Sequence, residues 1–367
     1  MPDKKRNATE RDKQFMRRAL ELAALGRGLT RPNPMVGAVL VKRGRIVGEG
    51  YHRRAGGRHA EIAALAGKQA RGATLYVTLE PCAHQGRTAP CVESLIAAGI
   101  AEVRYSIVDP NPLVNGAGAR CLRAAGIRVS RGLLAKEAER LNEIYLHRYS
   151  GSRPFVILKT AQTLDGRIAC SNGASQWISG IQSRRMAHRL RAEVDAVVVG
   201  SGTANQDDPQ LTVRLVKGAN PYRIALTSSG RLKPNLRLLR DNGDQRTIIA
   251  TSARELPKSL RKGLILWSIK SSPDGVSLTD FLDKAWGFGI HSLVVEGGAQ
   301  LATAFLRAGL VDKHIVSVAP RTLGSGIEAI TDLGARRVDD AIGYDRALFS
   351  PLGADIIFSG YPQNRVT

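Results

Sequence analysis

The sequence contains few cysteines and few aromatic residues. Its four cysteines are too few, in a chain of 367 residues, for the disulfide framework of a small secreted domain. Only Cys82 and Cys91 lie near each other, so they are better candidates for metal ligands or catalytic groups than for a disulfide. Cys121 and Cys170 stand alone, and we expect them to be small core residues.

Long apolar runs are also missing. No run approaches the roughly 20 residues that a membrane-spanning helix needs. The first residues, MPDKKRNATERDK, are charged and lack the apolar core of a signal peptide. We therefore expect a cytoplasmic protein with no membrane partner.

Acidic residues are scarce relative to basic ones. With 32 Asp and Glu against 54 Lys and Arg, the formal net charge is +22 at pH 7, which favours nucleic acid or phosphorylated small molecules as partners. The basic residues are spread along the chain, and aromatic residues make up only 5% of it. Such a pattern does not indicate a dedicated nucleic-acid surface. We expect a phosphorylated small-molecule substrate and no nucleic-acid partner.

The length and the order of the segments indicate two α/β domains. A single core stops growing at about 250–300 residues, which this chain exceeds. Strand-like segments such as ATLYVTLEPC and EVRYSIV alternate with helical ones, which favours a mostly parallel sheet. One amphipathic helix is expected over 132–152, and a second α/β pattern begins at FVILKTAQTLDG. We place the domains at 12–150 and 154–362.

A histidine, a glutamate and two cysteines form the most informative pattern. HAE begins a helix at His59, and LEPCAHQGRTAPC puts Cys82 after a strand and Cys91 at the start of a helix. An H-x-E sequence followed by a P-C…C pair holds one Zn²⁺ in nucleobase deaminases. Three protein ligands leave the fourth tetrahedral position to water, as in a catalytic zinc site. We therefore expect His59, Cys82 and Cys91 to bind one catalytic Zn²⁺.

Glu61 lies two residues after the expected ligand His59. Zinc lowers the pKa of its bound water to about 7. From the start of the helix, the Glu61 carboxylate can take a proton from that water and deliver it to the substrate as a general acid–base. The alternative is a structural zinc site, which normally has four protein ligands, and only His84 lies near enough in sequence to be the fourth.

The segment between the two cysteines carries a family resemblance. Eight residues separate Cys82 from Cys91, whereas the commonest deaminase signature has two. TLEPCAHQGRTAPC, with RPNPMVGAVLV and HAE before it and DPNPLVNGAG after it, resembles the deaminase half of the bifunctional riboflavin-biosynthesis enzymes. In the second half, KTAQTLDGRIA, SQWISG, DDPQLTVR and VEGGAQL resemble the reductase half of the same family.

The resemblance implies a fold and two activities. It implies a cytidine-deaminase-like α/β/α domain followed by a dihydrofolate-reductase-like α/β domain. The first would be a zinc-dependent hydrolase that deaminates 2,5-diamino-6-(5-phosphoribosylamino)pyrimidin-4(3H)-one. The second would be an oxidoreductase that uses NADPH to reduce the ribosyl side chain to ribityl. We also expect a homo-oligomer, either a dimer or a tetramer.

The resemblance also implies site residues. In the deaminase half, Glu61 would be the proton shuttle, and the substrate would contact Asn33, His52, His84 and Arg87. NADPH would contact Ala161, Trp177, Thr203, Asp207, Ser228, Gly298, Ala299, Gln300, Leu301, Ala302, Thr303 and Ala304. The reductase substrate would contact Ser175, Arg191, Leu211, Arg214 and Glu296, and Lys159 and Glu296 are candidates for a role in ring opening or protonation.

Two glycine-rich segments bear on the cofactor independently of the family. The glycines of VEGGAQL follow an apolar strand and open a helix, where backbone N–H groups can meet a phosphate. GSGT at 200–203 lacks the third glycine of a Rossmann fingerprint and does not favour that fold. The family resemblance, by contrast, implies an acidic residue near the cofactor where this chain has Thr227, which leaves the preference for NADPH over NADH open.

Two rival hypotheses remain at this point. The first is a tRNA or nucleobase deaminase with a C-terminal RNA-binding module, for which the net charge of +22 is the support. The second is a C-terminal half that is an inactive partner-binding domain, because a fold does not guarantee a function. A saturable response to NADPH would count against the first, and loss of reductase activity in an Arg214→Ala or Glu296→Ala variant would count against the second.

Overall fold

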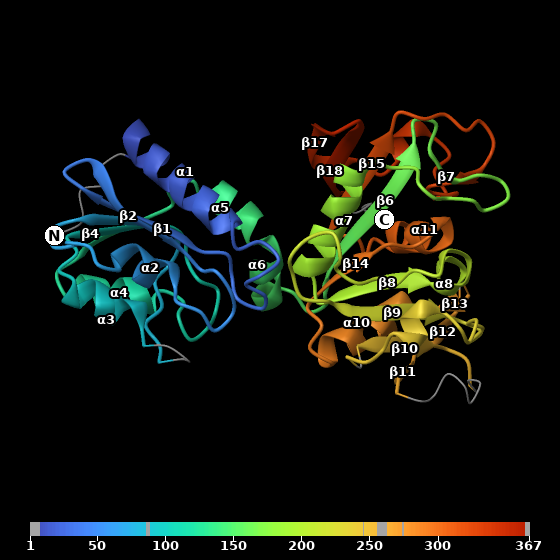
Figure 1. Ribbon diagram of the computed structural model, residues 1–367, viewed down its shortest axis with the longest axis horizontal. Coiled ribbons are helices and arrows are strands. Elements are labelled where there is room, and N and C mark those ends of the chain that lie inside the picture. Colours follow the sequence, from blue (N-terminus) through green and yellow to red (C-terminus); the bar gives the residue numbers. More distant parts are fainter. Residues whose placement is uncertain (1–7, 86–88, 245, 255–262, 274, 364–367) are drawn as a thin grey trace. The chain divides into compact units, whose positions relative to one another are not determined.

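The chain folds into two compact units, an N-terminal unit that ends at Ser150 and a C-terminal unit that begins at Gly151 (Figure 1). The computed structural model describes residues 8–85, 89–244, 246–254, 263–273 and 275–363. Within these ranges, no helix has both the length and the apolar character needed to cross a membrane.

The N-terminal unit is built on a five-stranded sheet in the order β2-β1-β3-β4-β5. Its strands are β1 (Gly37–Lys42), β2 (Arg45–Tyr51), β3 (Thr74–Leu79), β4 (Glu102–Ile107) and β5 (Arg128–Arg131). The three strands β3, β4 and β5 are parallel, whereas β1 is antiparallel to both its neighbours. The tight turn at Arg43 and Gly44, both with positive φ, returns the chain beside β1. The sheet is therefore parallel in only one half, less than the sequence predicted.

Helices cover both faces of this sheet, as Figure 1 shows. They are α1 (Glu10–Ala24), α2 (Ala60–Leu65), α3 (Cys91–Ala97), α4 (Ala117–Ala124), α5 (Ala135–Leu141) and α6 (Glu143–Ser150). On one face, Met16 and Ala19 of α1 pack on Val39 and Tyr76. On the other, residues of α2, α3 and α4 pack on β1, β3 and β4 in one core. The result is the α/β/α arrangement expected from the sequence.

Asn142 divides the helix that was predicted over 132–152. The Asn142 side chain is buried, accepts a hydrogen bond from Met35 N at 2.8 Å and donates one to Met35 O at 2.9 Å. Its backbone has left the helical region, with φ at −110°. The single-helix prediction was wrong because this buried amide ends α5 and ties the chain to the segment before β1.

Cys121 is exposed on α4, so the prediction of a core cysteine was wrong there. The residues of α4 that face the core are Gly118, Ala119 and Leu122. Cys121 lies on the solvent side of the same helix. Cys170 is half-buried.

The C-terminal unit is built on a nine-stranded sheet in the order β11-β10-β9-β8-β14-β6-β15-β18-β17. The strands are β6 (Phe155–Thr163), β8 (Ala196–Gly200), β9 (Tyr222–Thr227), β10 (Thr247–Thr251), β11 (Ile265–Ser268), β14 (Ser292–Val295), β15 (Lys313–Ala319), β17 (Tyr344–Leu352) and β18 (Asp355–Pro362). Pairing is parallel from β11 to β15, and β18 and β17 are added antiparallel at the edge.

Short elements surround this sheet. The helices are α7 (Ile181–Glu193), α8 (Ser201–Asp207), α9 (Arg237–Arg240), α10 (Leu278–Gly287), α11 (Ala299–Arg307) and a 3-10 turn at Val338–Asp340. Two small ribbons pair β7 (Arg167–Ala169) with β16 (Ile327–Glu328), and β12 (Ser271–Ser272) with β13 (Gly275–Val276). Phe281 of α10 and Phe305 of α11 are fully buried against the sheet in the largest core cluster.

A buried carboxylate joins the last strand to α7. Asp355, at the start of β18, is 3% exposed and accepts hydrogen bonds from Gly180 N at 2.8 Å and from the Ser183 hydroxyl. Gly180 is the N-cap of α7 and has no side chain of its own to cap the helix. A residue far along the chain therefore supplies the cap.

Candidate functional site

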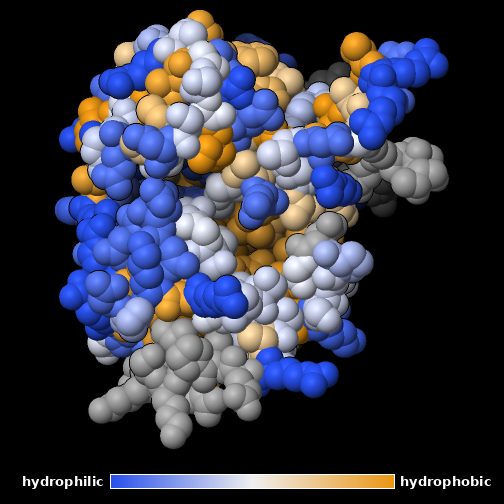
Figure 2. Space-filling view, turned by 90° about the vertical axis from the view of Figure 1, so that its right-hand side faces the viewer, coloured by the Kyte–Doolittle hydropathy of each residue, from blue (hydrophilic) through white to orange (hydrophobic). Residues whose placement is uncertain are grey.

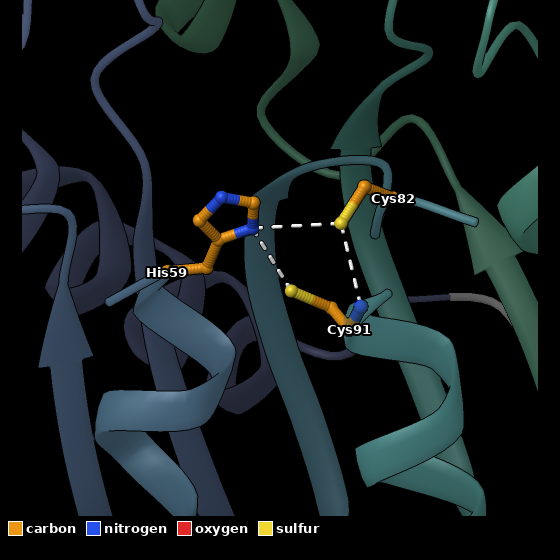
Figure 3. Close-up of side chains that lie close together, drawn as sticks. All are labelled: His59, Cys82 and Cys91. Carbon is orange, nitrogen blue, oxygen red and sulfur yellow. Dashed lines mark hydrogen bonds between the residues drawn. The ribbon is translucent and has the colours of Figure 1, made fainter. Parts of the chain in front are cut away.

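The three expected zinc ligands come together at the carboxyl end of β3. His59 is the N-cap of α2, Cys91 is the first residue of α3, and both point toward Cys82 in the loop after β3 (Figure 3). His59 Nδ1 lies 3.1 Å from Cys91 Sγ and 3.4 Å from Cys82 Sγ. Within the described ranges, no other group of three His, Cys, Asp or Glu side chains is close enough to share a metal ion.

The geometry of this group fits one Zn²⁺. With Zn–S bonds of about 2.3 Å and Zn–N bonds of about 2.0–2.1 Å, ligand atoms in a tetrahedral site lie about 3.5–3.8 Å apart. The three donor atoms all lie within 4.8 Å of one another, and His84 does not join them. A three-ligand group leaves a coordination position open, as in a catalytic zinc site rather than a structural one.

The two thiols influence each other strongly. Hydrogen bonds from the Cys91 thiol, from His59 and from the Cys91 N–H lower the pKa of Cys82, against the opposing effect of burial. The Cys82 sulfur and burial in turn raise the pKa of Cys91. Two such close sulfurs are both thiolates only beside a cation. The donor chemistry of the group therefore calls for a bound metal ion.

Glu61 lies beside this group in the first turn of α2. Its side chain is 4% exposed, and burial, followed by the charge of Cys82, raises its pKa to about 7. Interaction with the Cys91 thiol also places the carboxylate next to the metal group. A carboxyl group with a pKa near 7 can both take up and release a proton at neutral pH.

Two glycines allow the helices to approach closely here. A Cβ on Gly50 of β2 would overlap the Ala60 carbonyl at the start of α2. A Cβ on Gly118 of α4 would overlap the Pro81 carbonyl, next to Cys82. Larger residues at either position would displace the segments that carry the zinc group.

A cavity of about 480 Å³ opens beside the zinc group. It is lined by three of the expected substrate residues, Asn33, His52 and His84, together with Glu61. Arg87, the fourth expected substrate residue, lies outside the described residues. Among the described residues the buried Nδ1 of His84 has no hydrogen-bond partner, so it is available to a ligand.

Hydrogen bonds fix the tautomer of His52. Its Nδ1 lies 3.1 Å from the Arg58 carbonyl, which can only accept, so Nδ1 carries the proton. The Nε2 atom then accepts from Asn33 Nδ2 at 3.1 Å. Burial lowers the pKa of His52, which agrees with a neutral ring. The Asn33 carboxamide is thereby held at the cavity wall with its oxygen available to a substrate.

Sequence reasoning missed four other residues that line this cavity. Asp109, Tyr145, Arg148 and Tyr149 also line it. Tyr145 and Arg148 are three residues apart on α6, and the Tyr145 hydroxyl donates to Asp109 Oδ1 at 2.8 Å. The spacing of the aromatic and basic side chains in NEIYLHRY was the available signal, because residues three and four apart share a helix face.

Eight of the twelve expected cofactor residues line a cavity of about 780 Å³ in the C-terminal unit. Figure 2 shows a hollow with an apolar floor on this face. Its lining includes Thr203 and Asp207 of α8, Ser228 after β9, and Gly298, Ala299, Gln300, Leu301 and Ala304 at the start of α11. Thr203 Oγ1 accepts a hydrogen bond from Gly298 N at 2.9 Å, which joins the starts of the two helices.

Other expected cofactor residues do not line this cavity. Ala302 and Thr303 are buried on the inner side of α11, and Thr303 is hydrogen-bonded to Thr331. Ala161 lies in β6. Trp177 is 58% exposed, with the Arg184 guanidinium 4.5 Å from its ring centroid.

The expected substrate residues of this unit fall into two places. Ser175 lines the cofactor cavity and donates to Asp207 Oδ1 at 3.1 Å. Arg191 and Glu296 form a separate, largely buried pair, in which both carboxylate oxygens accept from the guanidinium at 2.7 Å. Leu211 is 2% exposed, so its side chain belongs to the core.

A histidine supports the segment that carries Arg214. His188 of α7 is buried, and its Nδ1 accepts from Arg214 N at 2.9 Å. Arg191 Nη1 donates to Thr212 O at 3.1 Å in the same segment. Lys159 also faces this cluster: burial lowers its pKa, while the Glu296 carboxylate opposes that effect. Arg191 of α7 and Lys159 of β6 thus both lie close to the largely buried carboxylate of Glu296.

Comparison with family models divides the chain in the same way. Residues 9–107 match the cytidine and deoxycytidylate deaminase zinc-binding region, and residues 154–342 match the RibD C-terminal domain. The second match does not fit an RNA-binding module, so that alternative loses its support.

Relatives match nearly the whole chain. The riboflavin biosynthesis protein RibD of Aquifex aeolicus is 43% identical over 352 residues, which is 95% of this chain and 98% of that protein. RibD of Escherichia coli is 44% identical over 364 residues, covering 94% and 98%. The solved structure of Acinetobacter baumannii RibD, form 1, is similar with a TM-score of 0.85 at 37% identity, covering 97% of this chain and 99% of that one.

A further similar structure names both activities. The Thermotoga maritima diaminohydroxyphosphoribosylaminopyrimidine deaminase/5-amino-6-(5-phosphoribosylamino)uracil reductase has a TM-score of 0.80 at 36% identity. It covers 96% of this chain and 98% of that one.

Proposed function

Because the chain belongs to the RibD family of bifunctional riboflavin-biosynthesis enzymes, we propose that its own residues carry out two successive reactions. The N-terminal unit deaminates 2,5-diamino-6-(5-phosphoribosylamino)pyrimidin-4(3H)-one. The C-terminal unit reduces the ribosyl side chain of the deaminated product to ribityl. A phosphate present on both substrates suits the net charge of +22.

In the deaminase unit, each residue beside the cavity has a defined part. His59, Cys82 and Cys91 hold the Zn²⁺, which supplies an activated water for attack on the amino-bearing carbon. Glu61 would take one proton from the attacking water and give it to the ring nitrogen. It would then carry the second proton, from the hydroxyl that forms on the ring carbon, to the amino group, which leaves as ammonia. Asn33, held by neutral His52, would orient the pyrimidine together with the Nδ1 of His84, which has no hydrogen-bond partner among the described residues. Arg87 would contact the phosphate.

The observation that carries this proposal is the burial of Glu61 beside a three-ligand metal group. Replacing it (Glu61→Gln) keeps the size and burial of the side chain but removes proton transfer. We expect zinc content to remain at one ion per chain, while ammonia release falls by about 10²–10⁴-fold, the usual contribution of a general acid–base. Metal analysis and an ammonia assay on the same preparation measure both. Normal ammonia release from the variant would refute the mechanism.

In the reductase unit, NADPH supplies the hydride when it is bound. Thr203, Asp207, Ser228 and the start of α11 at Gly298–Leu301 hold the cofactor in the cavity, and Ala161, Trp177 and the remaining α11 residues belong to the same proposed set. Ser175, which is hydrogen-bonded to Asp207 and lines the cofactor cavity, is our candidate for a residue that contacts the substrate next to the cofactor. Lys159 is the candidate to donate a proton as the ribose ring opens. Arg191, with Glu296, and Arg214 position the phosphate-bearing chain.

Titration with NADPH tests whether this unit is active or only a partner-binding domain. All three tryptophans, Trp177, Trp267 and Trp286, lie in the C-terminal unit, and Trp177 is both exposed and one of the expected cofactor residues. We expect saturable quenching of tryptophan fluorescence, and Trp177→Phe should remove most of it. Consumption of NADPH with the deaminated substrate completes the test. A chain that binds and oxidises no NADPH would leave the partner-binding hypothesis standing.

Self-association and cellular location are part of the same proposal. β17 is an edge strand of the nine-stranded sheet, and Leu348 and Phe349 on it are 62% and 68% exposed. An apolar edge strand favours pairing with a second copy of the chain. Light scattering should therefore show a dimer or tetramer, and Phe349→Lys should shift it toward monomer. A cytoplasmic location follows from the need of Cys82 and Cys91 for a reducing compartment.

A further inference from the structure

A second cavity of the N-terminal unit lies outside the zinc site. It has a volume of about 430 Å³ and is formed by the end of β4, the first turns of α4 and the end of β5. Its lining consists of Tyr105, Val108, Asn115, Gly116, Ala119, Arg120, Arg123 and Arg131. The proposed function uses none of these residues.

Three arginines surround this cavity, and among the described residues none of them forms an ion pair. Within the described ranges, the hydrogen bond that Arg123 donates goes to the Val129 carbonyl at 3.4 Å. The Arg120 guanidinium folds over Gly116, with Nη1 3.0 Å from where a Cβ on that glycine would stand. Most of the donors of these three guanidiniums are therefore left for a ligand.

The floor of the cavity contains a buried tyrosine. Tyr105 is 2% exposed, and burial, followed by the charge of Glu80, raises the pKa of its hydroxyl. The guanidiniums of Arg131 and Arg123 act in the opposite direction, so both lie near that hydroxyl. The floor can thus supply an O–H donor beneath the basic rim.

Glu80, the acidic group that acts on the Tyr105 hydroxyl, has its charge compensated elsewhere. Glu80 is 3% exposed, and its two carboxylate oxygens accept from Gly116 N at 2.9 Å and Ala119 N at 3.0 Å. These N–H groups belong to the start of α4, where the helix dipole also favours a negative charge. The Glu80 charge is therefore compensated by the helix, and the excess positive charge of the rim remains.

We propose that this cavity binds a small phosphate-bearing molecule, held by Arg120, Arg123, Arg131 and the Tyr105 hydroxyl. Planar guanidiniums match phosphate oxygens in pairs, and they bind phosphate more strongly than neutral donors. The volume of about 430 Å³ suits a small ligand. The lining contains one aromatic side chain, Tyr105, which is buried, so no surface is offered for stacking nucleic-acid bases.

The location connects this cavity with the deaminase cavity. Asp109 and Asn111 line the zinc-site cavity, whereas Asn115 and Gly116, a few residues later in the same segment, line the arginine cavity. A ligand that orders the second end of the segment also restrains the first. The site is therefore placed to influence deamination without contacting the deaminase substrate.

Hydrogen–deuterium exchange on the full chain tests this proposal, with inorganic phosphate and ribose 5-phosphate as separate probes. Chloride at equal ionic strength controls for screening. Both probes should slow exchange in peptides covering 115–132, and tighter binding of ribose 5-phosphate would identify a sugar phosphate rather than free phosphate as the ligand. The double variant Arg123→Gln/Arg131→Gln should weaken this protection about tenfold or more, since it removes two charge-assisted contacts.

A charge-matched control separates a site from general attraction. Arg45 and Arg140 are exposed arginines of the same unit that do not line the cavity. Arg45→Gln/Arg140→Gln should keep the protection of 115–132, and ammonia release should confirm that both double variants are folded. The proposal is overturned if neither probe protects 115–132, or if both double variants lose protection equally. It is also overturned if a short single-stranded oligonucleotide protects this segment better than ribose 5-phosphate.

Discussion

At the scale of single residues, His188 shows how a buried side chain can affect substrate binding indirectly. It acts through a hydrogen bond to the backbone of a proposed substrate-binding residue. Its Nδ1 accepts from Arg214 N, and Arg214 is a proposed ligand of the reductase substrate. His188→Leu leaves that N–H without its partner and loosens the segment around Arg214. We expect KM for the ribosyl substrate to rise about fivefold to tenfold, the value of one hydrogen bond, with a smaller change in kcat. Steady-state NADPH oxidation measures both constants.

The conservative variant provides the control for this prediction. His188→Asn keeps an acceptor of similar reach, so it should recover most of the affinity. If His188→Leu had an unchanged KM, the hydrogen bond to Arg214 would have no role in substrate binding.

Single residues also show what the sequence could and could not predict about the sites. His59, Glu61, Cys82 and Cys91 could be found because each occupies a fixed place in a short pattern. The wall of the same cavity formed by Asp109 and Tyr145 depends on a contact across 36 positions of the chain. No local sequence pattern predicts this contact, since it depends on how α6 packs back against the sheet.

At the scale of elements, α1 is fastened to the sheet by a buried charge cluster. Asp12 of α1 forms an ion pair with Arg104 at 2.9 Å and accepts from the Tyr76 hydroxyl at 2.6 Å. Asp12→Asn should lower the free energy of unfolding of the N-terminal unit by about 2–4 kcal/mol, because it leaves a buried guanidinium with one carboxylate, Glu102. Urea-induced zinc release, followed with a chromophoric chelator, measures this change.

An exposed pair on the same helix gives a matched control. Glu21 pairs with Arg18 at 3.2 Å, and both side chains are largely exposed. Glu21→Gln should change stability by no more than about 0.5 kcal/mol, as is usual for a surface pair. Equal effects of the two substitutions would show that the buried cluster does not hold α1.

The apolar periodicity of the sequence predicts some features of the helices and strands but not others. The strands and most helices follow from apolar patterns and from turn residues. The break at Asn142 does not, because the apolar pattern continues across it and a tertiary contact with Met35 ends the helix. The antiparallel pairing of β1 with β3 is also a long-range contact, whereas its pairing with β2 follows from the local turn at Arg43 and Gly44.

At the scale of the molecule, two buried histidines make the stability of the C-terminal unit depend on pH. Burial lowers the pKa of His188 and of His314 to about 4, against about 6.5 for an exposed histidine. Between these values the unfolded chain binds protons that the folded unit does not. Stability is therefore highest above about pH 6.5 and is lost as the pH falls toward about 4.

The size of this effect can be measured with the tryptophans, since all three lie in the C-terminal unit. From pH 7 to pH 5 we expect a loss of about 1–2 kcal/mol for each histidine. Urea titrations followed by tryptophan fluorescence should show it, and His188→Asn/His314→Asn should flatten the dependence. An equal slope in that double variant would assign the pH dependence to other groups.

The contact between Asp355 and the start of α7 affects when each unit can fold as the chain is synthesised on the ribosome. Every strand and helix of the N-terminal unit precedes Gly151, so that unit has all its parts while the rest is still being made. The C-terminal unit does not, because Asp355 caps α7 and β18 pairs with β15 in the sheet. Until β18 has emerged, α7 lacks its cap and β15 has an open edge. Nascent chains arrested before residue 355 should therefore bind zinc but not NADPH. At this stage of synthesis the edge of β15 is exposed and is a binding site for chaperones.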